Sequence, residues 1–137
     1  MLQSVNDMYE NLKEIHNEDR TATTYFNRGD SDSYDFMTGD LTFDDGYHDL
    51  DLSGVLPSGV KTVHMTVSLL DNAAGSYFIM RKKGNVSEYN VSVARTQVAD
   101  VWYDYEAWLP CDENRFIQYR GVAGFTNVYL RIRGWTY

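Results

Sequence analysis

The sequence contains little cysteine and little histidine. A single cysteine, Cys111, excludes an intrachain disulfide, so the fold must be held by packing, by association with other chains, or by both. The three histidines, His16, His48 and His64, lie far apart, and Cys111 has no cysteine or histidine at metal-ligand spacing. These residues therefore predict no zinc site, and the sequence indicates no bound cofactor.

The chain also lacks the hydrophobic segments that direct proteins to membranes. It has no run of about 18 apolar residues, the length that a membrane-spanning helix needs. Its N-terminus lacks the basic region, apolar run and cleavage site of a secretory signal. These absences predict a protein that is made in the cytoplasm without a signal peptide and without membrane insertion. Such a chain can still leave the cell as part of a particle assembled in the cytoplasm.

Positive charge is scarce, because 12 Lys and Arg stand against 20 Asp and Glu, for a net charge of −8. A field of this sign repels a polyanion, so we expect no nucleic-acid partner. The charge is uneven: residues 1–56 hold three basic and 13 acidic side chains, whereas residues 57–137 hold nine and seven. The two parts are expected to face different surroundings.

Aromatic residues are what the sequence has in excess. They make up 15% of the 137 residues, beside ten glycines and only two prolines. Aromatic side chains favour strands over helices, and this length suits one domain. Composition therefore predicts a single, mainly β domain.

The start of the chain departs from this β character. Its apolar residues recur at alternating spacings of four and three, and they are Met1, Val5, Met8, Leu12 and Ile15. This spacing predicts an amphipathic helix over residues 1–20. Its stripe of Val5, Met8, Leu12 and Ile15 either packs on its own domain or associates with copies of itself or with a larger partner.

From residue 21 onward the apolar period changes to two, which predicts antiparallel strands joined by turns. The segments with this pattern are 21–28, 41–43, 47–52, 60–70, 76–82, 88–93, 101–109, 115–120 and 127–135. We therefore predict that residues 21–137 form an antiparallel, jelly-roll-like β-sandwich of about eight strands. The tight turn at 71–75 predicts that 60–70 and 76–82 pair as a hairpin.

An acidic segment precedes the main body of the predicted sandwich. Its members are Asp30, Asp32, Asp35, Asp40, Asp44, Asp45, Asp49 and Asp51. The segment begins like a calcium-binding loop at Asp30, but Asp35 occupies the position of the EF-hand glycine and Leu41 that of the bidentate Glu. We expect a solvated acidic loop, with a weak calcium site as the alternative.

Motifs that support catalysis are absent from the linear sequence. There is no G-x-S-x-G elbow, no phosphate-binding loop and no G-x-G-x-x-G. Asp104 and Glu106 share one face of a predicted strand, with Glu88 and Asp100 as further carboxylates, which leaves a polysaccharide-cleaving enzyme as an alternative. We predict that the protein is not an enzyme.

Two predicted strands carry aromatic and arginine side chains opposite their apolar residues. In 127–135, for example, Val128, Leu130 and Ile132 alternate with the polar and aromatic positions. The candidate contact residues are Trp102, Trp108, Tyr129, Arg131, Arg133 and Trp135. Such a surface is either a cross-strand stack that covers a sheet, a subunit interface, or a platform on which sugars stack.

Turn and strand phrases between residues 50 and 137 resemble those of a known group of proteins. The phrases are 51–61, 71–76, 81–85, 88–90, 95–99 and the final Gly134-Trp135. They resemble small β-sandwich structural proteins and terminal modules of tailed bacteriophages and prophages. The resemblance implies a virion surface protein, such as a capsid decoration, a head fibre or a tail-fibre tip, often trimeric. It assigns no functional residues.

The residues and the resemblance together predict a non-enzymatic virion structural protein. We expect it to form a homotrimer, to contact other virion proteins and to project its sandwich from the particle. The alternative is a lectin-like, receptor-binding module in which Trp102, Trp108 and Trp135 stack on a host-surface glycan.

Overall fold

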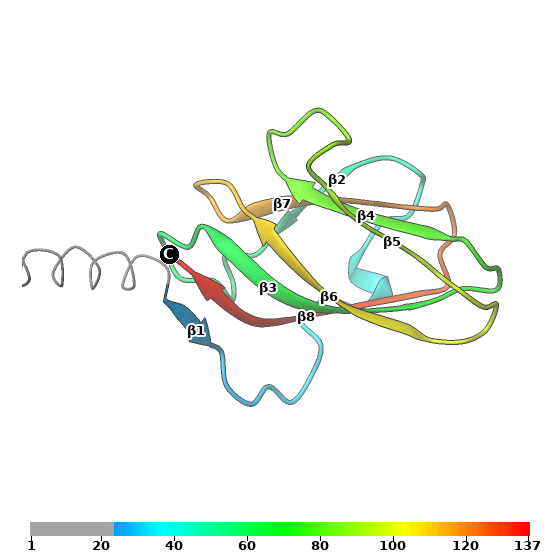
Figure 1. Ribbon diagram of the computed structural model, residues 1–137, viewed down its shortest axis with the longest axis horizontal. Coiled ribbons are helices and arrows are strands. Elements are labelled where there is room, and N and C mark those ends of the chain that lie inside the picture. Colours follow the sequence, from blue (N-terminus) through cyan, green and yellow to red (C-terminus); the bar gives the residue numbers. More distant parts are fainter. Residues whose placement is uncertain (1–23) are drawn as a thin grey trace, which may run out of the picture.

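The computed structural model describes residues 24–137, which fold into two packed β-sheets (Figure 1). The elements are β1 (Tyr25–Asn27), the 3-10 turn η1 (Thr38–Asp40), β2 (His48–Asp51), β3 (Thr62–Leu70), β4 (Tyr77–Lys82), β5 (Ser92–Arg95), β6 (Tyr103–Pro110), β7 (Phe116–Gly121) and β8 (Asn127–Thr136). No helix within this part of the chain is long and apolar enough to cross a membrane. The helix predicted over residues 1–20, with Val5, Met8, Leu12 and Ile15, lies outside the described residues.

The two sheets have the strand order of a jelly roll. Both are antiparallel and four-stranded, with orders β1-β8-β3-β6 and β2-β7-β4-β5. Consecutive strands lie in opposite sheets, except β4 and β5, which pair directly as a hairpin. The predicted jelly-roll-like sandwich of about eight strands is therefore confirmed.

The core lies between the two sheets, and β3 contributes most to it. Its inward side chains Val63, Met65, Val67 and Leu69 are completely buried, as the alternating pattern predicted. The opposite sheet supplies equally buried residues, the largest being Phe78. Each such side chain stabilises the fold by about 1.5–3 kcal/mol relative to an exposed one.

The hairpin predicted between segments 60–70 and 76–82 does not form. β3 has β8 on one edge and β6 on the other, so neither edge is available to β4. The connection between β3 and β4 instead crosses from one sheet to the other. A tight turn in the sequence predicts a change of direction, but it does not determine whether the next strand stays in the same sheet.

Asp71 holds this crossing in place. Its carboxylate accepts hydrogen bonds from the Ser76 hydroxyl and from both the backbone N–H and the hydroxyl of Thr126, the latter two at 3.1 and 2.7 Å. Its carbonyl accepts the N–H of Asp100 at 2.8 Å. One buried residue therefore joins three loops at the same end of the sandwich.

Two other predicted strands differ from the structure. No strand forms at 41–43, where Leu41 is buried and the N–H of Thr42 donates to the Tyr119 hydroxyl at 2.7 Å. The strand predicted at 88–93 begins only at Ser92. The preceding loop leaves Val86 and Tyr89 almost fully exposed, at 91% and 98%. Within 88–93 the alternation of Tyr89 with polar residues predicted a strand, but its exposed ring has no packing that would stabilise one.

Candidate functional site

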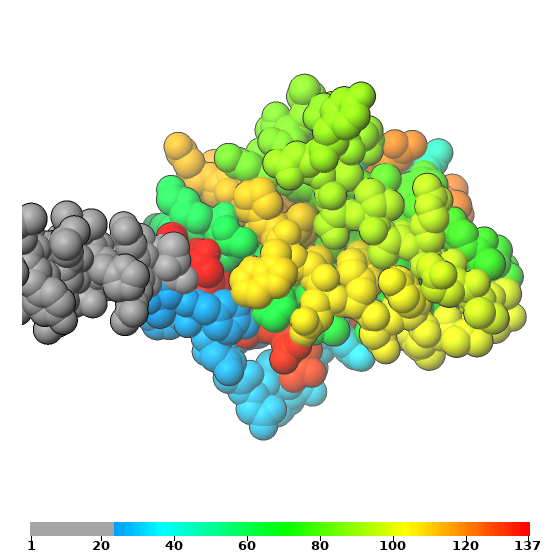
Figure 2. All heavy atoms as spheres, in the orientation of Figure 1, coloured from blue at the N-terminus to red at the C-terminus, as the bar shows by residue number. Residues whose placement is uncertain are grey.

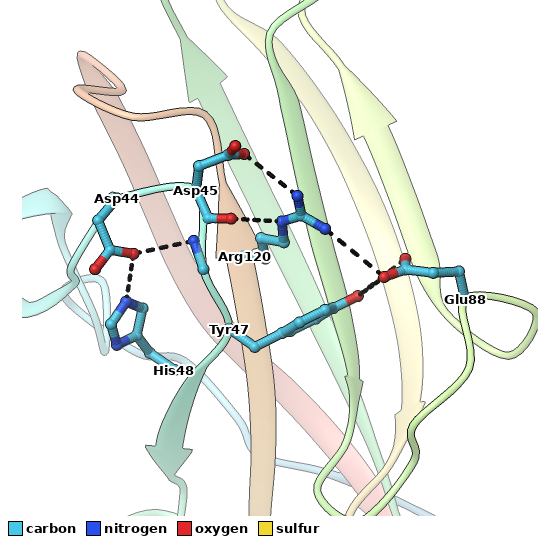
Figure 3. A network of polar contacts seen from close by, with 7 residues as sticks. Asp44, Asp45, Tyr47, His48, Glu88 and Arg120 are labelled. Carbon is cyan, nitrogen blue, oxygen red and sulfur yellow. Dashed lines mark hydrogen bonds and ion pairs between the residues drawn. The ribbon is translucent and has the colours of Figure 1, made fainter.

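On the solvent side of the β2-β7-β4-β5 sheet, polar side chains bind one another (Figure 3). Arg120 donates to the carbonyl of Asp45 at 2.7 Å and lies 3.7 Å from the Glu88 carboxylate. The Tyr47 hydroxyl donates to Glu88 at 3.1 Å, and the Arg81 guanidinium lies 3.5 Å from the centre of the Tyr47 ring. Burial and the Glu88 carboxylate raise the pKa of Tyr47, so its hydroxyl stays protonated and keeps donating.

Asp44, Asp45 and Asp49 of the acidic segment contribute to this surface, and other members of the segment are bound elsewhere. Asp44 accepts a hydrogen bond from His48 at 2.7 Å, and Asp49 from Lys83 at 2.8 Å; these bonds lower the pKa of both carboxyls. Three others are engaged by Arg28 or by backbone N–H groups, and they are Asp35, Asp40 and Asp51. Within residues 24–137 no three His, Cys, Asp or Glu side chains gather to hold a metal ion.

The opposite surface, which we call the outer face, belongs to the β1-β8-β3-β6 sheet and is organised in rows. The strand register places three residues from β8, β3 and β6 side by side in each row. They are the distal row of Tyr129, Ser68 and Asp104, the middle row of Arg131, Thr66 and Glu106, and the proximal row of Gly134, His64 and Trp108. Aromatic rings therefore lie at both ends of the face, with charged residues between them.

Two further rings extend the distal row. The ring centre of Trp102 lies 5.2 Å from that of Tyr129, and the ring centre of Tyr34 lies 4.9 Å from that of Tyr129. Together with Ser68 and Asp104 they line a pocket of about 310 Å³. Trp102 and Tyr34 are 44% and 41% exposed, so their rings are accessible from solvent.

The loop that carries Tyr34 is tied to the edge of β8. Asp35 accepts hydrogen bonds from the Arg28 side chain at 2.5 Å and from the N–H of Ile132 at 2.7 Å. The N–H of Asp35 in turn donates to the carbonyl of Leu130 at 2.9 Å. Because β1 pairs only with residues 134–136, this loop covers the adjacent part of the β8 edge and fixes the position of Tyr34.

Replacing Asp35 by Ala should loosen this loop and lower the free energy of unfolding by about 1.5 kcal/mol, because a charged acceptor of two hydrogen bonds is lost. Urea unfolding measures the loss. Asp32→Ala is the matched control, since Asp32 is exposed and has no partner among the described residues. Equal stability of the two variants would contradict the role given to Asp35.

Tyr25 joins His64 and Trp108 of the proximal row in a cluster of three rings. Trp108 lies parallel to His64 with ring centres 4.1 Å apart, and Tyr25 packs against both. The Tyr25 hydroxyl is hydrogen-bonded to Nδ1 of His64 at 3.0 Å. These rings bury His64, although it lies on the polar side of β3, whereas Trp108 remains 52% exposed.

Glu106 of the middle row forms an ion pair with Arg133 of β8. Arg133 is an extra residue in β8, because the register shifts between His64 and Met65. This bulge reverses the alternation of the residues that follow it. Trp135 therefore pairs with the inward-facing Val63 and packs against the core, so the prediction that it shares the outer face is wrong.

The structure brings most of the predicted contact residues together. Trp102, Trp108, Tyr129, Arg131 and Arg133 share the outer face. Sequence reasoning missed Tyr25 and Tyr34, which reach this face from segments distant in the chain. Only the aromatic character of these two residues pointed to a contact role, and no spacing linked them to β6 or β8.

Cys111 is the remaining reactive side chain, and it lies away from the outer face in the core. It is buried and forms no disulfide within residues 24–137. Burial, together with the nearby Asp112 charge, raises the pKa of its thiol. The thiolate form that attacks substrates is therefore disfavoured.

Comparison with known proteins supplies no family to which these features can be assigned. A scan against family models finds no match to the chain. A search of curated proteins also finds no match. The functional interpretation therefore rests on the outer face and on the resemblance of the strand and turn phrases.

Proposed function

We propose that the protein is a non-enzymatic structural component of a phage particle, which associates with copies of itself and displays the sandwich on the particle. The phage setting rests on the resemblance of residues 50–137. The observation that carries a role in contact is the outer face, where exposed Trp102 and Trp108 flank a charged row on an open sheet. Exposed aromatic and arginine side chains of this kind dominate the energetics of contact surfaces.

The engagement of the reactive groups supports a role without catalysis. Within residues 24–137, His48 is paired with Asp44, His64 is stacked under Trp108, and Cys111 is buried in the core. Glu106, the carboxylate considered for glycoside cleavage, is paired with Arg133. None of these groups combines an accessible nucleophile with an adjacent base.

The position of β1, where the described chain starts, supports display of the sandwich away from the particle. β1, at the start of the described chain, lies beside the end of β8 at one end of the molecule (Figures 1 and 2). Thr62 of β3 and Tyr25 of β1 both pair with Thr136, and Ser68 of the distal row lies six residues beyond Thr62. At a rise of about 3.3 Å per residue, the distal row lies about 20 Å from β1. A particle attached through residues 1–23 would leave the distal row outward.

Light scattering of the full-length protein tests this proposal. We expect a mass close to three times the 15.8 kDa of one chain. Leu12→Glu places a charge in the predicted apolar stripe and should reduce the trimer to monomers, since a charge in such a seam is costly. Asn11→Glu, which adds the same charge outside the stripe, should leave the mass unchanged. A monomeric wild type, or equal masses for the two variants, would refute the role given to this segment.

A further inference from the structure

The distal row brings two unpartnered polar side chains and three aromatic rings together in one pocket. The Asp104 carboxylate and the Ser68 hydroxyl form no hydrogen bond or ion pair with any other residue between 24 and 137. By contrast, Glu106 in the next row is paired with Arg133. The carboxylate and the hydroxyl are thus available to a ligand, and both line the same pocket.

The rings beside these polar groups form a platform instead of a cage. The ring centres of Trp102 and Tyr34 lie 5.2 and 4.9 Å from that of Tyr129, which puts neighbouring rings in direct contact. A cage for a quaternary ammonium group needs rings that stand apart around the cation. The ring planes of Trp102 and Tyr34 are tilted by 40° and 43° against that of Tyr129, so this platform is faceted and not flat. Its exposed ring faces suit a ligand with an apolar face, because electron-rich ring faces attract C–H groups.

The size and charge of the pocket narrow the class of ligand. Its volume of about 310 Å³ is at the lower end of the range of ligand pockets, so it suits one ring-sized unit. The only charged side chain in its lining is Asp104. A carboxylate accepts hydrogen bonds from hydroxyl groups but repels another carboxylate. The ligand is therefore rich in hydroxyls, carries no negative charge and has an apolar face.

We propose that this pocket binds a neutral pyranose unit of a glycan. The C–H face of the sugar stacks on Trp102, and two of its hydroxyls donate to Asp104 and Ser68. The hydrogen bonds of Asp35 fix the loop that carries Tyr34 before the sugar binds, which limits the entropy lost by ordering this loop on binding. The chemistry of the pocket does not depend on the phage setting. Only its outward display on a particle rests on the proposed function.

The test is binding of full-length protein to an array of defined oligosaccharides, half of them neutral and half containing uronic acids. We expect binding to neutral members, with uronic-acid analogues at least about tenfold weaker because of repulsion by Asp104. Trp102→Ala and Asp104→Asn should each weaken binding about tenfold. Tyr89→Ala is the control, since it removes an exposed aromatic ring from the loop before β5 of the other sheet, and it should change binding less than twofold.

Five outcomes would overturn the proposal, four of them in the glycan-binding data and one in competition with choline. The first four are no binding to any neutral glycan, equal binding of neutral and acidic glycans, full binding by Trp102→Ala, or an equal loss in Tyr89→Ala. Choline is included as a competitor, and its displacement of the glycan through Trp102 would replace the platform with a cation site. Tyr34→Ala, a change in a surface loop, provides a second variant if Trp102→Ala does not fold.

Failure of this site and failure of the proposed function are separable. The mass of each variant is measured in the same samples. A trimer that binds no glycan refutes the sugar site alone. A monomer that binds neutral glycans through Trp102 refutes the assembly role alone and leaves the sugar site in place.

Discussion

Replacing Asp71 by Ala should lower the free energy of unfolding by about 3 kcal/mol, because a buried charged acceptor of three hydrogen bonds is lost. The N–H and hydroxyl of Thr126 and the hydroxyl of Ser76 would lose their acceptor. Urea unfolding followed by tryptophan fluorescence measures the change. Asp51→Ala is the control, since that carboxylate is exposed and accepts only from the residues of its own turn.

The same residue predicts how stability depends on pH. Burial raises the pKa of Asp71, but the hydrogen bonds from Ser76 and Thr126 outweigh it, so its pKa is lowered in the folded protein. A lowered pKa adds stability above the unfolded value of about 3.9, and this contribution is lost as the pH falls through the folded value. The stability difference between wild type and Asp71→Ala should therefore be largest near neutral pH and shrink below about pH 4. A difference that stays constant down to pH 2 would exclude an ionised Asp71.

Replacing Gly134 by Ala should displace β1 from the sheet and cost about 2 kcal/mol, because a side chain is forced into a filled space. A Cβ atom at Gly134 would overlap the Tyr25 hydroxyl and the carbonyl oxygen of Phe26. The cluster of Tyr25, His64 and Trp108 would then open, since the Tyr25 hydroxyl is hydrogen-bonded to His64. Hydrogen exchange of the backbone in β1 and the emission of Trp108 report the displacement.

Gly54→Ala is the matched control for this prediction. A Cβ at Gly54 meets nothing within 4 Å, so the same added methyl group should be tolerated. If Gly134→Ala were as stable as Gly54→Ala and β1 kept its protection from exchange, the close packing of Tyr25 over β8 would not constrain the sheet.

Sequence reasoning correctly predicted which side chains are buried where burial follows from alternation along a single strand. The alternation in β3 correctly separated Val63 and Met65 from the polar residues between them, because one side of that strand is fully buried. Prediction failed where a single extra residue changes the register. The bulge at Arg133 turns Trp135 toward the core, and no local pattern in β8 announces it.

The candidate site was predicted only in part, for the same physical reason. Trp102 and Tyr129 were selected as contact residues from alternation in two separate strands, and the structure places their rings in contact. Their meeting with Tyr34 depends on the loop that Asp35 attaches to β8, almost a hundred residues away. A pairing over this separation requires the complete strand order, which no local pattern contains.

The pairing of β1 with β8 has a consequence for how the chain folds. Tyr25 pairs with Thr136, so the register joins residues close to the two limits of the described chain. The central strand β3 likewise needs β6 and β8, both made after it. The contact order of the fold is therefore high, which makes folding slow and places completion of the sheet after synthesis of the last strand. On a ribosome β1 therefore stays without its partner until β8, the last strand, has emerged.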